Sequence, residues 1–219
     1  TIEDGVYYDT SKFKDYGKLA RLDIKGLKAG ARVEIAEGKL HPTDFALWKF
    51  SLERKRDMEW DSPFGRGFPG WHIECSAMAM KYLGETFDIH TGGVDNIFPH
   101  HENEIAQSEG ATGKPFVKFW MHCEHLMVEG RKMAKSLGNY STLRDVLDKG
   151  YSPLAIRYLL MATHYRQQVK FTFDGLDAAR NGLERYHAFV ANLCDVVSAT
   201  DGGEADKLIE SATAGFEAA

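Results

Sequence analysis

Residues 87–104, FDIHTGGVDNIFPHHENE, carry the pattern that decides the fold class of this chain. Phe87–His90 has the composition of a short buried strand, and the Gly92–Gly93 pair that follows ends it with a turn. Pro99 then opens a helix at a position where its missing backbone N–H is no loss. A strand, a glycine turn and a helix in this order are typical of nucleotide-binding α/β folds. We therefore predict an α/β protein.

The two helices that flank this strand carry side chains of metal-binding type. Apolar periodicity and a glycine stop predict a helix over 71–83, and Cys75 lies on it. His100 and Glu104 are four residues apart, so they share one face of the following helix. A thiolate, an imidazole and a carboxylate form a set that favours zinc over magnesium or calcium. On the residues alone, a purely structural role for these three side chains stays open.

A second candidate site lies further along, where Lys132 and Lys135 occupy a loop between Gly130 and Gly138. When ATP activates a carboxylate, negative charge moves toward the pyrophosphate leaving group, and mobile lysines can neutralise it. A nucleotide would also need backbone close to its adenosine, which the Gly92–Gly93 turn allows. Glycine turns occur in many folds, so the position of this turn directly after the predicted strand is what favours nucleotide binding.

The N-terminal part of the chain predicts short strands and loops over residues 1–58. Strand candidates are Gly5–Tyr8 and residues 30–35, and residues 44–50 form an aromatic-rich return segment. The charged run at 53–57 predicts a solvated loop.

The C-terminal part is predicted to be mainly helical. It follows strands at 116–121 and 126–128 and a turn at 129–130. Helix-start signals precede three helices and are found at Thr142, Ser152 and Asp174. Apolar residues at spacings of three and four predict a buried stripe along the last helix: Leu176, Ala179, Leu183, Tyr186, Val190, Leu193 and Val197. Beyond Thr200 we expect a solvated linker and a short helix.

Composition limits the class of protein. The 219 residues include 43% hydrophobic residues, enough to bury a core, and the net charge of -5 argues against a generally basic, nonspecific nucleic-acid binder. Three cysteines are an odd number in so long a chain, so a disulfide framework is not expected and a reducing cytoplasm fits. The chain contains no apolar run of the roughly 20 residues that span a bilayer, so we expect no membrane association.

Several blocks of the sequence resemble the cysteinyl-tRNA synthetase family of class I aminoacyl-tRNA synthetases. The resemblance runs from about Gly5 to about Val197 and is carried by residues 6–9, 29–34, 44–49, 60–63, 69–78, 100–109 and 132–139. It implies the second half of a Rossmann-like class I catalytic domain with a connective insertion, followed by a helical domain. The implied regions are part of the connective insertion at 1–58, the catalytic half with the zinc site and lysine loop at 59–141, and a helical stem-contact and linker region at 142–219.

The chain departs from this family pattern at identifiable places. The early His-Ile-Gly-His motif of class I synthetases is absent, and the chain opens at Thr1 without an initiating Met. We therefore expect a fragment that lacks both the half carrying this motif and the C-terminal anticodon-binding region. Ala134 stands where the family usually has serine, and Thr91 where it usually has a third glycine.

The resemblance also implies roles for individual residues. Cys75, His100 and Glu104 would be three ligands of one Zn²⁺ per chain, the fourth being a cysteine ahead of the missing motif. Trp71 and His90 would line the cysteine pocket. The remaining residues would serve ATP and its Mg²⁺: Lys132 and Lys135 as catalytic residues, Lys135 at the phosphates, Gly92 and Gly93 at the adenosine, and Asp95 near the ribose.

The implied activity is ATP-dependent activation of cysteine to cysteinyl adenylate and its transfer to tRNA(Cys). The partners would be cysteine, ATP and tRNA(Cys), and we expect a cytoplasmic monomer. Because half of the nucleotide fold and one zinc ligand are missing, we expect this chain to be inactive alone. Two alternatives stay open: a relative that joins cysteine to an amino sugar by the same adenylation chemistry, and a non-catalytic binding module derived from a synthetase.

Overall fold

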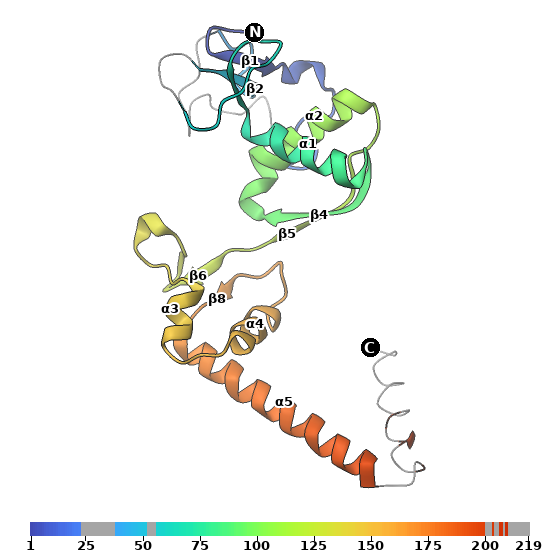
Figure 1. Ribbon diagram of the computed structural model, residues 1–219, viewed down its shortest axis with the longest axis vertical. Helices are drawn as coiled ribbons and strands as arrows, with labels where there is room; N and C mark the ends of the chain where they lie inside the picture. The colour runs from blue at the N-terminus through green and yellow to red at the C-terminus, as the bar shows by residue number, and fades with distance from the viewer. Residues whose placement is uncertain (23–37, 52–55, 200–202, 204–205, 208, 210–219) are drawn as a thin grey trace. The chain divides into compact units, whose positions relative to one another are not determined.

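The computed structural model describes residues 1–22, 38–51, 56–199, 203, 206, 207 and 209. The strand predicted at 30–35 lies outside these residues, as do most of the charged run at 53–57 and most of the segment after Thr200. The chain forms two compact units, Thr1–Cys123 and Glu124–Ala219, called here the first and second units (Figure 1). The regions predicted at 1–58, 59–141 and 142–219 are functional assignments and stay predictions.

An antiparallel sheet opens the first unit. Its strands lie in the order β1 (Gly5–Tyr8), β2 (Phe45–Phe50) and β3 (Gly67–Pro69), and the 3-10 turn η1 (Thr10–Lys12) follows β1. The strand predicted at Gly5–Tyr8 and the return segment at 44–50 are therefore confirmed. Tyr8 stacks on Phe45 with ring centroids 5.1 Å apart, and its hydroxyl donates to the carbonyl of Ala106 at 2.9 Å. These contacts hold the sheet against the helix that contains Ala106.

Two helices of the first unit carry the predicted metal ligands. Helix α1 (Trp71–Leu83) has the predicted bounds, because Gly84 adopts a φ of 92° that other residues rarely take. Helix α2 (Glu102–Thr112) begins later than predicted. The 3-10 turn η3 (Val94–Asn96) and the π-helical turn η4 (Ile97–His101) precede it. Regular α-helical bonding starts after η4 because the backbone of Phe98 inside that turn is extended.

The strand predicted before the glycines is longer than expected. Strand β4 (Phe87–Gly93) includes both glycines and pairs in parallel with β5 (Val117–Cys123). In this register Gly92 lies opposite His122 and Gly93 opposite Cys123. The predicted break at the glycines is wrong, because a glycine backbone can keep its place in a ladder although it adds no side-chain packing.

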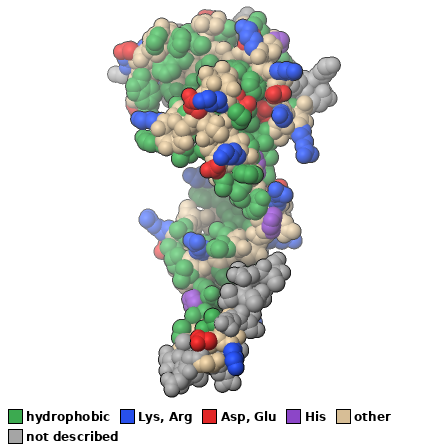
Figure 2. All heavy atoms as spheres, turned by 90° about the vertical axis from the view of Figure 1, so that its right-hand side faces the viewer, with side chains coloured by type: hydrophobic (Ala, Val, Ile, Leu, Met, Phe, Trp, Pro, Cys, Tyr) green, Lys and Arg blue, Asp and Glu red, His purple; other side chains and the backbone are tan. Residues whose placement is uncertain are grey.

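The same strand is also more exposed than predicted. Phe87 is its one buried residue, whereas Ile89 and the residue opposite it, Phe119, are 54% and 65% exposed. A parallel strand is buried on both faces only within a covered sheet. The described part of this sheet has two strands, so one set of side chains faces outward. Figure 2 shows hydrophobic side chains reaching the surface of the molecule among charged ones.

The second unit combines a small sheet with three helices. The sheet has the order β7 (Arg131–Lys132), β6 (Leu126–Val128) and β8 (Val169–Lys170), and the 3-10 turn η5 (Lys135–Leu137) follows β7. The helices are α3 (Leu143–Asp148), α4 (Pro153–Met161) and α5 (Phe173–Ala199). Two of the predicted helix starts are confirmed, because Thr142 forms a capping box with Asp145 and the Ser152 side chain accepts from the backbone N–H of Ala155.

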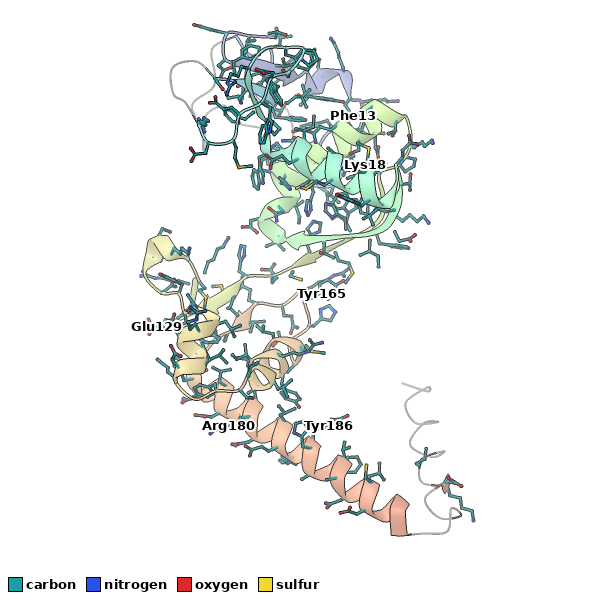
Figure 3. The ribbon with its side chains drawn as sticks, viewed as in Figure 1. Phe13, Lys18, Glu129, Tyr165, Arg180 and Tyr186 are labelled. Carbon is teal, nitrogen blue, oxygen red and sulfur yellow. The ribbon has the colours of Figure 1, made fainter. Side chains whose placement is uncertain are left out.

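The stripe predicted along α5 is buried only in its first turns. Leu176 and Ala179 are buried, and Leu176 joins the core with Val146 and Phe171. Further along the helix Tyr186 is 60% exposed; Figure 3 labels this residue together with Arg180. The prediction of burial is wrong at Tyr186 and Val190, because α4, which packs against α5, has 9 residues and α5 has 27. The side chain of Val197 lies outside the described ones. None of the helices formed by the described residues has the combined length and apolar character of a membrane span.

Candidate functional site

Cys75, His100 and Glu104 converge in the first unit. Cys75 comes from α1, His100 from the π-helical turn and Glu104 from the first turn of α2. One potential ligand atom of each lies within 4.8 Å of those of the other two. His100 and Glu104 are buried and Cys75 is half-buried. The sequence alone suggested these three side chains as ligands by their type and spacing. Packing of α1 against α2 brings them together in space.

Glu104 is the centre of this cluster, and its two carboxylate oxygens have different surroundings. Oε2 accepts from Nε2 of His90 at 2.9 Å. Oε1 lies 2.9 Å from Nε2 of His100, but it has no hydrogen-bond partner among the described residues. Burial opposes ionisation, yet the imidazoles of His100 and His90 lower the pKa of Glu104 to about 2. The side chain is thus a carboxylate at neutral pH, with Oε2 bonded to His90 and Oε1 beside Nε2 of His100.

Two further aromatic side chains surround His100. Nδ1 of His72 lies 2.9 Å from Nδ1 of His100, and burial, followed by the charge of His100, lowers the pKa of His72 to about 4. The ring of Trp71 lies over His100 with centroids 4.3 Å apart, although Trp71 itself is 59% exposed. His72 follows Trp71 directly in the sequence, yet nothing in the pattern distinguished it from an ordinary core histidine.

The donor set fits a divalent soft metal. The pKa of the Cys75 thiol is raised by burial and then by the charges of Glu104 and Glu74, so the free thiol stays protonated at neutral pH. A cation at the cluster would offset both effects, since it favours the thiolate. It would also bind Oε1 of Glu104, a buried oxygen that has no hydrogen-bond partner among the described residues. Sulfur, imidazole nitrogen and carboxylate oxygen are the ligand types of zinc sites.

A second group of possible ligands shares Glu104 with the first. His90, His101 and Glu104 also offer atoms within 4.8 Å of one another. Nδ1 of His101 lies 2.8 Å from Nε2 of His122, much as Nδ1 of His100 meets His72. The second group lacks a thiolate, so the group that includes Cys75 matches the ligand preference of zinc better. The sequence analysis assigned no site role to His101 or His122, although His101 is adjacent to the predicted ligand His100 and His122 to Cys123.

Trp71 and His90, predicted to line a cysteine pocket, both lie at this cluster. The ring of Trp71 covers His100, as described above, and the His90 side chain is 23% exposed. His90 also has a structural task, because it bonds to Glu104. Both residues are thus close to the candidate metal ligands, while their contact with an amino acid stays a prediction.

Gly92 and Gly93, which were predicted to approach the adenosine, are also required to be glycine by the space around them. A Cβ atom on Gly92 would lie 2.5 Å from Cε1 of His101, and one on Gly93 would lie 2.5 Å from Oδ1 of Asp95. Neither position accepts a larger residue without displacement of its neighbour. Gly92 thus makes room for the histidine cluster, and Asp95 lies directly against Gly93.

The predicted phosphate loop belongs to the second unit. Lys132 ends β7 and Lys135 begins the 3-10 turn after it, and both side chains are exposed. Asn139 shapes the loop: its Oδ1 accepts from the backbone N–H of Ala134 at 2.9 Å, and its Nδ2 donates to the carbonyl of Lys132 at 3.1 Å. Sequence reasoning treated Asn139 as part of a motif and missed this bracing role.

Glu102, next to the candidate ligands, anchors the N-terminal segment to α2. Its buried carboxylate accepts from the backbone N–H groups of Gly17 at 2.7 Å and Ala20 at 2.9 Å. The hydroxyl of Tyr16 donates to Oδ1 of the adjacent Asn103 at 2.6 Å. The start of α2 is thus held from one side by this segment and carries the cluster residue Glu104 on the other.

Comparison with known proteins identifies relatives of the chain. The family model described as "tRNA synthetases class I (C) catalytic domain" matches residues 1–181. The curated cysteine–tRNA ligase of Protochlamydia amoebophila is 49% identical over 218 residues, which are 98% of this chain and 46% of the relative. The cysteine–tRNA ligase of Solibacter usitatus is 56% identical, over 87% of this chain and 41% of the relative. The cysteine–tRNA ligase of Thermococcus onnurineus is 54% identical, over 87% of this chain and 39% of the relative.

The chain therefore spans less than half the length of these curated relatives. Among solved structures, the ternary complex of the Agrobacterium radiobacter K84 agnB2 LeuRS with tRNA and LeuAMS is 22% identical. That likeness covers 63% of this chain and 22% of that chain, with a TM-score of 0.44.

Proposed function

Because the chain belongs to the family of class I (C) tRNA synthetase catalytic domains, we propose that it is the part of a cysteine–tRNA ligase that recognises cysteine and binds ATP. The whole protein would activate cysteine to cysteinyl adenylate and transfer it to tRNA(Cys). The convergence of Cys75, His100 and Glu104 within 4.8 Å is the observation that carries this proposal. The curated relatives that are about 50% identical to this chain are named cysteine–tRNA ligases, which supports the proposal.

The cluster would select the amino acid. Cysteine and serine are similar in size, and packing alone separates such substrates by only about two orders of magnitude. A Zn²⁺ ion bound by Cys75, His100 and Glu104 would act as a Lewis acid that prefers a thiolate sulfur to a serine hydroxyl. The protein's own part is to hold the three ligands with their lone pairs converging and to keep Glu104 ionised.

Trp71 and His90 would form the wall of the amino-acid pocket. The exposed Trp71 ring lies over His100, so an amino acid at the cluster would meet the indole face. His90 would contact the substrate with its partly exposed edge while its Nε2 remains bonded to Glu104.

The lysine loop would serve the phosphates. Lys132 and Lys135 are exposed on a loop braced by Asn139, so their ammonium groups can meet ATP and neutralise charge that develops on pyrophosphate. Mg²⁺ would accompany ATP. Gly92 and Gly93 would approach the adenosine, and Asp95 the ribose.

We further propose that residues 59–141 form the second half of a Rossmann-like fold, that residues 1–58 are part of its connective insertion, and that residues 142–219 form a helical stem-contact and linker region. The parallel pair of β4 and β5 joined through α2 supports the first of these statements. We propose a cytoplasmic monomer that gains activity only with the remainder of the catalytic fold.

Metal analysis and cysteine-dependent exchange of pyrophosphate into ATP test the proposal. The whole protein should contain about one zinc per chain, and Cys75→Ser should lower zinc content and cysteine activation together. Unchanged cysteine affinity in a zinc-depleted Cys75→Ser protein would contradict the ligand assignment. The 219-residue chain alone should give no exchange. Charging of tRNA(Cys) by the whole protein separates this function from amino-sugar ligation and from a non-catalytic module, neither of which would charge tRNA.

A further inference from the structure

A cavity of about 420 Å³ lies in the first unit between two segments, residues 10–16 and 41–43. The candidate metal ligands Cys75, His100 and Glu104 are not part of its lining. Its volume is within the range of about 300–1,000 Å³ that is usual for ligand pockets. The cavity is therefore large enough for a small ligand or for a projecting part of a larger one.

The buried carboxylate of Asp44 fixes the two segments to one another. Its Oδ1 accepts from both the backbone N–H and the hydroxyl of Thr10 at 3.0 Å, and its Oδ2 accepts from the backbone N–H of His41 at 3.0 Å. Because the Thr10 hydroxyl donates to Asp44, the hydroxyl of Thr43, 2.6 Å away, donates to Thr10. The walls are thus held in place before a ligand arrives, which lowers the cost of binding.

The lining combines ring side chains with one cation. Phe13, Tyr16 and Pro42 supply the rings. Lys14 is exposed, and its side chain forms no ion pair or hydrogen bond with a described residue. Flat apolar surfaces beside a free ammonium group suit a planar ring that carries a phosphate.

The acidic side chains close to the cavity are already engaged. Asp9 accepts from the hydroxyl of Ser11 at 2.6 Å and lies 3.5 Å from the ammonium group of Lys12. It also lies 4.0 Å from Nε2 of His41. Asp44 is bonded to three donors, as described above. Neither carboxylate is part of the described lining, so an anion in the cavity would not meet an unpaired acid there.

Tyr16 joins the cavity to the helix that carries Glu104. Its hydroxyl donates to Oδ1 of Asn103 at 2.6 Å, and the backbone N–H of the next residue, Gly17, donates to Glu102 at 2.7 Å. A group held in the cavity is therefore connected to the candidate cysteine site through the start of α2.

We propose that this cavity binds an unpaired nucleotide of an RNA, with the base against the rings of Phe13, Tyr16 and Pro42 and the phosphate beside Lys14. Proteins recognise single-stranded RNA by stacking its bases on aromatic side chains. The inference rests on the proposed function and deepens it, because tRNA is the RNA that this function supplies. A free nucleoside monophosphate has the same chemistry, but one lysine offers it little affinity, whereas other contacts along an RNA would raise its effective concentration at the cavity.

The first test compares two lysines of one segment. Fluorescence anisotropy of a labelled tRNA(Cys) transcript with the 219-residue chain should show weaker binding in Lys14→Gln. The slope of log K against log salt should be shallower by about 0.7, as for one lost phosphate contact. Lys18→Gln removes the same charge at an exposed position outside the lining, labelled with Phe13 in Figure 3, and should change neither quantity. Equal effects of the two variants would overturn the inference.

The second test concerns the ring of Phe13. Phe13→Leu keeps an apolar side chain but loses the stacking surface, so it should weaken RNA binding about 5- to 100-fold. Phe13→Tyr keeps the ring and should bind RNA with nearly the original affinity. A folded Phe13→Leu chain that binds RNA as tightly as the unsubstituted chain would overturn the inference, and the lysine comparison decides it if this variant does not fold.

The third test separates RNA from free nucleotide. The four ribonucleoside 5′-monophosphates, titrated into the ¹⁵N-labelled chain, should shift the backbone amide signals of residues 10–16 only in the millimolar range, and tRNA(Cys) should displace them. Micromolar binding of a monophosphate that tRNA(Cys) does not displace would overturn the RNA as its source.

A fourth measurement keeps this inference distinct from the proposed function. In the whole protein, Lys14→Gln should raise the KM for tRNA(Cys) in charging and not the KM for cysteine, and an unchanged KM for tRNA(Cys) would overturn the inference. If the unsubstituted whole protein gave no cysteine-dependent pyrophosphate exchange, the proposed function would fail, while the RNA affinities of the 219-residue chain would still decide the role of the cavity.

Discussion

The Nε2–H of His90 donates to Oε2 of Glu104 at 2.9 Å, and this bond ties strand β4 to helix α2 beside the candidate metal ligands. It leaves Oε1 of Glu104 facing His100. Through this bond His90, at the end of the predicted strand, holds the carboxylate of Glu104 in the cluster on α1 and α2. Because Nε2 of His90 is bonded to Glu104, the contact with substrate that we propose for His90 would use the rest of its ring.

We expect His90→Phe to weaken Zn²⁺ binding about 10- to 100-fold, because Glu104 loses the donor that orients its carboxylate. His90→Gln can place an amide N–H near the Nε2 position and should retain most of the affinity. Chelator competition on both variants measures this. Equal affinity in His90→Phe and the unsubstituted chain would show that His90 does not support the ligand.

The metal-free chain should lose stability as the pH falls from neutral toward 4. Burial lowers the pKa of His101 from 6.5 to about 4, with nearby histidines adding to the effect and Glu104 opposing it. Between these values the unfolded chain binds a proton at this residue that the folded chain does not, so protonation favours unfolding. Urea unfolding at several pH values above 4.5 measures the slope in a range where Glu104, with its pKa of about 2, stays ionised in the fold.

His101→Gln should reduce this slope, and His187→Gln, at an exposed position, should leave it unchanged. A slope that is the same in all three chains would exclude His101 as a source of the pH dependence.

Glu102→Ala should destabilise the first unit by about 1–3 kcal/mol, because it leaves the backbone N–H groups of Gly17 and Ala20 without their acceptor. Glu102→Gln keeps one acceptor oxygen and should have a smaller effect. Glu184→Ala, at an exposed position of α5, should change the free energy of unfolding by less than about 0.5 kcal/mol. Chemical denaturation compares the three, and a Glu102→Ala chain as stable as the Glu184→Ala chain would contradict the anchoring role.

In the whole protein, Asn139→Ala should slow cysteine-dependent pyrophosphate exchange by roughly 10- to 100-fold, because the loop that presents Lys132 and Lys135 loses its brace. Asn139→Asp keeps the acceptor for the Ala134 N–H but loses the donor to Lys132, so its effect should be intermediate. The KM for cysteine should change little in either variant. A rise in that KM with an unchanged turnover rate would place Asn139 at the amino-acid site instead.

Lys135→Ala in the whole protein should slow adenylation more than it weakens cysteine binding, because the ammonium group would meet phosphate and not the amino acid. Pyrophosphate exchange and equilibrium binding of cysteine measure the two effects separately. Lys149→Ala, at an exposed lysine of the second unit, is the matched control. Loss of cysteine affinity equal to the loss of rate would contradict the assignment.

Local signals in the sequence predicted helix ends well. The ends of α1, α3 and α4 are set by Gly84, Thr142 and Ser152, whose effects reach only a few residues along the chain. The start of α2 was predicted too early, because the extended backbone of Phe98 interrupts the turn that Pro99 belongs to.

The sequence by itself determined the α/β class, the bounds of α1, the starts of α3 and α4 and the residue types of a zinc set, because capping and side-chain chemistry are properties of short segments. Only the tertiary structure decided that α1 and α2 bring Cys75, His100 and Glu104 together. It also placed His72 and His90 against these residues and left the far part of α5 exposed. Such contacts join residues that are distant in the chain, and their geometry depends on how whole elements pack, which no local pattern specifies.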